Sequence, residues 1–206
     1  MRWIKYSVIF CVILALGSVS GQNMKSLEFQ VGSLNPKDLR SGTIWDVKYG
    51  IAVDEKVDIQ VGIAYFNKSY TKTEVIGDTT DEFGKEQEIK EKMKQTTALL
   101  PLSVNATVHF PLSPPFGIYA GAGLSWQFLF LNYKDYDTGK DRNVTYNGGG
   151  WVGRVGAEYE LGTRSSLIAE VHYNNCKVKE NKKGQIFKQR DVSGLGFKVG
   201  LRVILF

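Results

Sequence analysis

The side chains best suited to catalysis or metal binding in this chain are His109, His172 and Cys176. A histidine activates a nucleophile only when that nucleophile lies within hydrogen-bond reach. The residue two positions after His172 is Asn174, and Cys176 is four positions away along an extended segment. His109 has no second histidine or cysteine near it in the sequence, so a metal site is not expected either. We therefore expect no catalytic centre, no metal and no cofactor, and we expect His172 to be a hydrogen-bonding residue.

Charged residues recur at alternate positions within otherwise apolar segments. In the C-terminal segment, Lys198 and Arg202 alternate with Phe197, Val199 and Leu201. Successive side chains of a strand point to opposite faces, so one face of each segment is polar and the other is apolar. The charged residues of the polar parity are Glu28, Asp46, Lys48, Asp58, Arg154, Glu158, Glu160, Glu170, Lys198 and Arg202.

If the polar faces enclose a narrow interior, these six carboxylates and four bases must pair with one another or with water, because an unpaired buried charge is costly. We interpret them as a structural network of salt bridges. The functional alternative is a gated pore or a proton path.

Eight segments with this alternation predict eight strands, at residues 27–33, 43–53, 57–67, 98–110, 116–130, 151–161, 166–173 and 192–206. The connections after the second, fourth and sixth segments are short, at 54–56, 111–115 and 162–164. Those after the third, fifth and seventh are long and charged, at 68–97, 132–147 and 174–191. Short turns at one end and long loops at the other are typical of periplasmic turns and extracellular loops.

Period two does not say which face points inward, so a soluble barrel of the lipocalin or avidin kind is the competing fold. The apolar face carries more bulky side chains than an eight-stranded barrel can enclose, whereas the polar face is thinned by glycines such as Gly121, Gly156 and Gly196. We therefore predict an all-β, eight-stranded, antiparallel up-and-down transmembrane β-barrel. Aromatic residues should form two girdles, an outer one with Trp45, Tyr65, Trp126, Phe128, Trp151 and Tyr173, and an inner one with Phe110, Phe116 and Tyr159.

The N-terminus predicts export. Arg2 and Lys5 precede an apolar run that ends in small residues, which is the pattern of a cleaved signal peptide. We assign residues 1–21 to this peptide and 22–206 to a single barrel domain, which we expect to be monomeric. Cys176 is then the one cysteine left, so no intramolecular disulfide is expected. The net charge falls from +5 to +3 when the leader is removed. This charge is too small and too scattered along the chain to favour binding of nucleic acid.

At this point the chain resembles the small outer-membrane barrels of the OmpA/OmpX type. The segments that carry the resemblance are Leu100-Pro101-Leu102-Ser103, the strand Phe116-Gly117-Ile118-Tyr119-Ala120-Gly121 and the closing strand to Phe206. The resemblance implies a place in the outer membrane of a Gram-negative bacterium, contact with membrane lipid and lipopolysaccharide, and recognition of the C-terminal strand by the barrel assembly machinery. Phe206 departs from the family pattern because it falls on the interior parity, which implies a bulge near Ile204 or a variant signal.

Some outer-membrane lipid A deacylases are small barrels that place a serine two residues after a histidine. Here that position is Asn174, so a lipid A-modifying enzyme is the least favoured of the functions that we considered, and we expect no enzyme.

The last long loop is strongly basic. Its cations outnumber Glu180, its one acidic residue within 177–190, and they are Lys177, Lys179, Lys182, Lys183, Lys188 and Arg190. Lipopolysaccharide phosphates are the nearest anions to such a loop in an outer membrane. The alternative interpretation is that the loop is basic and solvated and binds no ligand. We expect a structural or surface-interaction role, in adhesion or lipopolysaccharide contact, with a host or neighbouring surface protein as a further partner. The alternative is a narrow pore for small solutes.

Overall fold

The computed structural model describes residues 24–80, 86–134, 141–180 and 189–205. Its strands are β1 (Lys25–Pro36), β2 (Gly42–Asp54), β3 (Val57–Thr80), β4 (Glu86–Pro111), β5 (Phe116–Lys134), β6 (Asp141–Glu160), β7 (Ser165–Glu180), β8 (Gln189–Asp191) and β9 (Gly194–Leu205). None of the described residues forms a helix long and apolar enough to cross a membrane. The proposed signal peptide and Phe206 lie outside the described residues.

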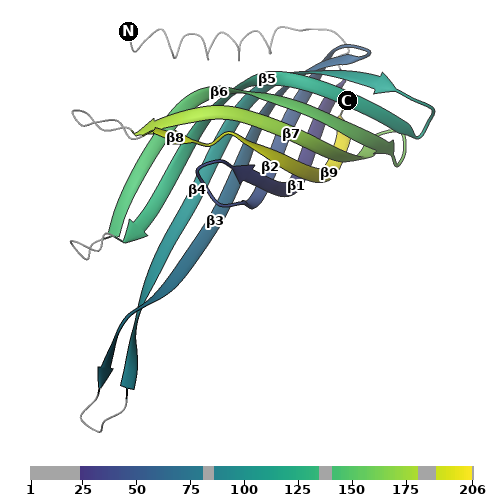
Figure 1. Ribbon diagram of the computed structural model, residues 1–206. Coiled ribbons are helices and arrows are strands. Elements are labelled where there is room, and N and C mark those ends of the chain that lie inside the picture. The colour runs from purple at the N-terminus through teal and green to yellow at the C-terminus, as the bar shows by residue number, and fades with distance from the viewer. Residues whose placement is uncertain (1–23, 81–85, 135–140, 181–188, 206) are drawn as a thin grey trace, which may run out of the picture.

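Eight of these strands close into a barrel. Each of β1 to β7 pairs antiparallel with the next, β7 also pairs with β9, and β9 pairs with β1 along its whole length. Figure 1 shows the tilted strands wrapping around one axis. The predicted eight-stranded antiparallel barrel is therefore confirmed. The register between β1 and β9 runs without a shift to the pair Lys25 and Leu205, so no bulge occurs near Ile204.

The apolar parity faces outward. Phe29, Trp45, Ile63, Phe130 and Leu201 are each close to half exposed, although a water-soluble fold would bury such side chains. Trp151 and Tyr173 pack together in the outer girdle, with ring centroids 5.6 Å apart. Phe116 and Tyr159 do so at the other end, 5.2 Å apart. The soluble alternative, with apolar residues inside along the whole barrel, is thereby excluded.

Three of the expected long loops are largely strand. The largest extension joins Lys68–Thr80 of β3 to Glu86–Thr97 of β4, and we call it the projecting hairpin. Pairing of β2 with β3 stops at Thr43 and Asn67, and pairing of β5 with β4 begins near Gln95, so most of this ribbon has no further neighbour. Figure 1 shows it extending far beyond the rest of the barrel. The apolar stripe ends at the membrane, but backbone hydrogen bonds continue past it because every residue except proline can form them.

The predicted closing strand is interrupted at its outer end, between β8 and β9. Ser193 causes the break, because its hydroxyl accepts a hydrogen bond from the Cys176 backbone N–H at 3.0 Å, where a ladder carbonyl would otherwise lie. Its own N–H donates to the Asp191 carboxylate at 2.9 Å. Hydrogen bonds from Ser193 hold the pKa of Asp191 below its usual value. The chain thus pairs with β7 as β8, bends at Ser193 and pairs with β7 again as β9.

Candidate functional site

The inner part of the barrel interior is filled by charged and histidine side chains from every barrel strand except β5. At the inner mouth, the Arg202 guanidinium lies 2.6 Å from carboxylate oxygens of both Glu28 and Glu158. Next to it, His109 lies 3.0 Å from Asp58. Gln60 donates hydrogen bonds to both Glu28 and Asp58 and so bridges the two carboxylates. The result is a cross-linked layer that ties β1, β3, β4, β6 and β9 together.

Glu170 is the centre of the next layer outward. Its carboxylate lies 3.2 Å from Lys48 Nζ, 3.1 Å from an Arg154 nitrogen and 2.9 Å from Lys198 Nζ. Asp46 lies 2.5 Å from Lys198 Nζ and 3.4 Å from Lys48 Nζ. All five side chains are buried. Each cation therefore has two carboxylate partners or more, counting the 3.6 Å approach of Arg154 to Glu28, as buried charges require.

Small residues make room for these long side chains. Tyr119 donates a hydrogen bond from its hydroxyl to Glu170 at 3.2 Å, and its ring lies between Arg154 and Arg202, at 5.6 and 5.1 Å from their guanidinium carbons. A Cβ added to Gly156 would overlap the Tyr119 ring. The glycine-thinned polar parity of the sequence therefore reflects interior packing.

One member of the predicted charged set differs in position. Glu160 is exposed at the end of β6, where its backbone N–H donates to the Pro115 carbonyl. It borders an open hollow of about 330 Å³ at the inner mouth, together with Glu158 and Arg202. Glu160 has the predicted parity, but β6 ends at this residue, so the side chain lies in water. The structure brings the other nine charged residues together, with Glu158 half-buried at the mouth.

Above the charges lies a layer of neutral polar side chains. The Gln127 amide donates to Asn174 at 2.5 Å, and Asn174 donates to the Val192 carbonyl at 3.1 Å. His172 is buried, and its Nδ1 has no hydrogen-bond partner among the described residues. This atom, Asn105 Oδ1 and Gln127 Oε1 are unpaired and belong to residues that line a cavity of about 50 Å³. A cavity of that size and polarity suits a few ordered waters.

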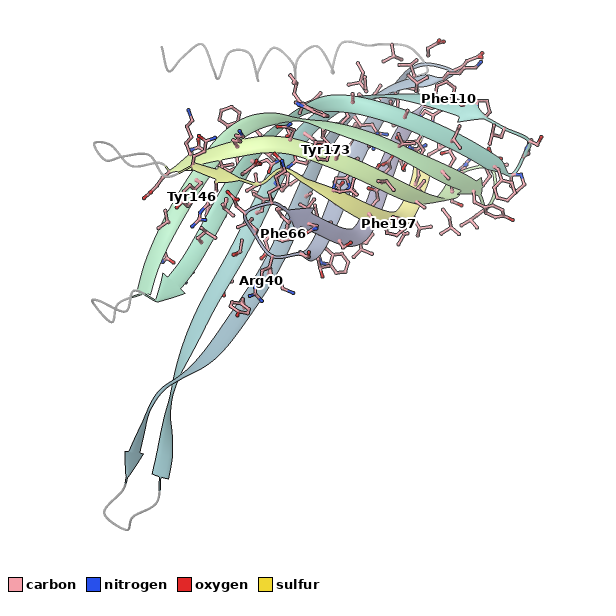
Figure 2. The ribbon with its side chains drawn as sticks, in the orientation of Figure 1. Arg40, Phe66, Phe110, Tyr146, Tyr173 and Phe197 are labelled. Atoms are coloured by element: carbon pink, nitrogen blue, oxygen red, sulfur yellow. The ribbon has the colours of Figure 1, made fainter. Side chains whose placement is uncertain are left out.

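The outer part of the interior is apolar, in contrast to the expected polar interior. Its buried cluster consists of Leu34, Ile44, Ala64, Phe66, Leu99, Leu129, Leu131, Val144, Tyr146, Cys176, Val178 and Val192. Figure 2 shows Phe66 and Tyr146 towards the end of the barrel from which the hairpin projects, and Phe110 at the opposite end. The expectation of a polar interior throughout is therefore wrong. The sequence signal was present, since Phe66 and Leu129 are apolar residues on the polar parity, near strand ends.

The basic loop is divided between described and undescribed residues. Lys177 and Lys179 are exposed on β7, and Arg190 is exposed on β8, opposite Val178. Lys182, Lys183 and Lys188 lie outside the described residues. Lys177 and Lys179 share the outward-facing parity of Val171 and Tyr173, so they continue the membrane-facing surface beyond the aromatic girdle.

Asn174 takes the position two residues after His172, and its side chain lies in the neutral polar layer. Asn174 bonds to Gln127, and neither residue is a nucleophile that His172 could activate. Within the described residues, no group of histidine, cysteine and carboxylate side chains has the arrangement of a metal site. What the interior does provide is cohesion, because eight strands are tied together by charge pairs on one side of the cavity and by apolar packing on the other.

Comparison with known proteins agrees with this architecture. The profile of the family described as "Outer membrane protein beta-barrel domain" matches residues 11–203. The outer membrane protein OprG from Pseudomonas aeruginosa is similar, with 14% sequence identity, a TM-score of 0.62, and coverage of 89% of this chain and 96% of that one. A search of curated proteins gives no match.

Two further solved structures share the fold. A major outer membrane protein from Thermus thermophilus has 15% identity and a TM-score of 0.56, with 88% of this chain and 99% of that chain covered. Neisserial surface protein A has 16% identity and a TM-score of 0.53, with 89% and 97% covered. The chain belongs to the outer membrane protein beta-barrel domain family. It is a protein of the outer membrane.

Proposed function

We propose that this protein is a closed outer-membrane barrel that acts at the cell surface by binding lipopolysaccharide phosphates through Lys177 and Lys179. The observation that carries the proposal is the contrast between a filled interior and exposed cations on the membrane-facing side of β7. The interior is crossed by a charged layer around Glu170 and then by the apolar cluster around Phe66. A solute would have to break both layers to pass.

The position of the cations supports a lipid partner. Lys177 follows Tyr173 by four residues on the same face, which corresponds to about 13 Å along a strand. An aromatic girdle marks the boundary of the hydrocarbon region, so the ammonium groups lie at the level where lipid phosphates are found. Arg190 on the neighbouring strand β8 is paired with Val178, whose side chain is buried in the interior, so Arg190 lies on the other face of the sheet and is not part of this surface.

Lipopolysaccharide binding tests the proposal directly. Protein refolded in detergent without lipopolysaccharide is titrated with it, for wild type and for Lys177→Gln/Lys179→Gln. The matched control is Lys25→Gln/Lys56→Gln, which removes two exposed cations at the inner end of the barrel. We expect the β7 pair to bind at least about tenfold more weakly and the control to match wild type. Equal affinity in all three proteins would refute the proposal.

A planar bilayer separates the closed barrel from the alternative functions. We expect no stable conductance steps from the wild-type protein, and reproducible steps would favour the narrow pore. Mass spectrometry of lipid A from cells that express the protein addresses the enzyme alternative. An altered lipid A that reverts in His172→Ala would restore that hypothesis.

A further inference from the structure

A second cationic surface lies at the outer end of the barrel and is separate from the basic loop. It lines a hollow of about 430 Å³ between the β1–β2 connection and the base of the projecting hairpin. The connection contributes Lys37, Asp38, Leu39 and Arg40, and the hairpin contributes Lys68, Tyr70 and Thr97. Figure 2 shows Arg40 beside the base of the hairpin.

The hollow faces the barrel axis and the external solvent. Lys68 and Tyr70 share the parity of Phe66 and Gln60, whose side chains point into the interior. Leu39 packs against the apolar cluster, so the hollow lies directly above the closed part of the barrel. A ligand here would arrive from outside the cell, whereas Lys177 and Lys179 face the surrounding membrane.

The charges of the hollow are arranged for an anion. The Arg40 guanidinium carbon lies 3.5 Å from the centre of the Tyr70 ring, which fixes the plane of its donors before a ligand arrives. Neither Arg40 nor Lys68 has an ion-pair partner among the described residues. The Lys37 side chain is 63% exposed, and its Nζ lies as far as 4.0 Å from the Asp191 carboxylate. The ammonium group therefore remains accessible.

The one carboxylate in the hollow is already used. Asp38 accepts a hydrogen bond from the Asp191 backbone N–H at 2.7 Å, which anchors the β1–β2 connection to β8. Three cations against this single anchored carboxylate leave the lining with a net positive charge.

We propose that this hollow binds a sulfated saccharide that reaches the barrel from outside the cell. Its volume suits a ligand larger than one inorganic anion, because pockets for small molecules hold about 300–1,000 Å³. The cations lie on two opposing elements, so a ligand that carries several anionic groups can contact both at once. Apart from Leu39 and the covered ring of Tyr70, the lining is polar or charged, which favours a sugar with hydroxyl and sulfate groups over an apolar ligand.

Two matched sugars and two pairs of variants test the proposal. A fluorescent heparin-derived tetrasaccharide is titrated into refolded protein in lipopolysaccharide-free detergent, and the unsulfated tetrasaccharide of the same backbone is the ligand control. Arg40→Gln/Lys68→Gln removes two cations of the hollow. Lys177→Gln/Lys179→Gln removes two cations of the membrane-facing side and is the protein control.

We expect the sulfated sugar to bind wild type and the β7 variant equally, and to bind Arg40→Gln/Lys68→Gln at least about tenfold more weakly. The affinity should fall with added salt. Arg40→Lys should lie between the two, because it keeps the charge and loses the planar donors. Heat-dependent gel mobility verifies that each variant is folded.

Lack of binding by wild type, equal binding of the unsulfated sugar, or a loss confined to the β7 variant would each overturn the proposal. Lipopolysaccharide titrated into the same proteins distinguishes the two surfaces. If the Arg40→Gln/Lys68→Gln change weakens lipopolysaccharide binding and leaves the sulfated sugar unaffected, the hollow binds the cell's own lipid and our assignment is wrong. A failure at Lys177 and Lys179 bears only on the function proposed in the preceding section.

Discussion

Replacing Glu170 with glutamine should destabilise the barrel severely, because it removes one negative charge from between three buried cations. Glu170 lies within 3.2 Å of Lys48, Arg154 and Lys198 and is almost completely buried. Glutamine keeps the size of the side chain and a carbonyl acceptor, so packing is preserved and the charge alone is tested. After the change, Asp46 and Glu28 are the carboxylates that remain near these three cations, and Glu28 also pairs with Arg202.

The size of the expected destabilisation follows from the burial of Glu170. Removing one partner of a buried ion pair costs about 3–5 kcal/mol, and we expect Glu170→Gln to reduce the free energy of unfolding by that amount. The matched control is Glu160→Gln, at the exposed end of β6, which should change the free energy by less than about 0.5 kcal/mol.

Urea unfolding in lipid vesicles, followed by tryptophan fluorescence and gel mobility, measures both variants. Adding Lys198→Met to Glu170→Gln should recover part of the loss, because a buried cation leaves together with its partner. If Glu170→Gln unfolds at the same urea concentration as Glu160→Gln, the charged layer does not stabilise the barrel and our reasoning about the closed interior fails.

Three further perturbations test separate features of the fold. Gly196→Ala should destabilise the barrel by about 1–3 kcal/mol, since the new methyl group would overlap the His172 ring. The control Gly153→Ala lies on the outer face, where the new methyl group would make only an ordinary contact at 3.5 Å, and it should be neutral in the same urea titration. Equal effects of the two changes would contradict the packing argument. Phe66→Ala should cost about 3–5 kcal/mol and should let a water-soluble maleimide label Cys176, which is 1% exposed in the same cluster; unchanged labelling would show that the outer cluster does not seal the interior. Backbone amides of the projecting hairpin should exchange with deuterium much faster than those of residues 57–67, because the ribbon pairs on one side only; equal protection in both regions would reveal an additional partner strand.

The strands were predictable where the membrane imposes its pattern. Leu195, Phe197, Val199 and Leu201 are apolar because they face lipid, and this requirement is written directly into the sequence. Beyond the membrane the requirement ends, so the extension of β3 to Thr80 and of β4 back to Glu86 carries no comparable signal. The break at Ser193 was also not foreseen, because it depends on a hydrogen bond with Cys176 of the neighbouring strand.

The sequence predicted which charged residues belong to the candidate site, but not which of them contact one another. Parity identified Lys48, Glu170 and Lys198 as interior residues, because a strand has only two faces. It could not show that Lys48 contacts Glu170, which lies 122 positions away, nor that Glu160 falls outside the network. Those facts depend on the relative stagger of strands around the barrel, which sets the height of each residue along the axis.

The sequence by itself determined the class of protein, the number of spanning strands, the face of each strand and the composition of the charged interior. The tertiary structure decided the vertical order of that interior: charges at the inner end, neutral polar groups above them and an apolar cluster at the outer end. It also brought Arg40 over Tyr70 and placed Lys68 in the same hollow. The physical reason is that residue type and spacing specify local geometry, whereas closure of the barrel sets which distant side chains lie at the same level.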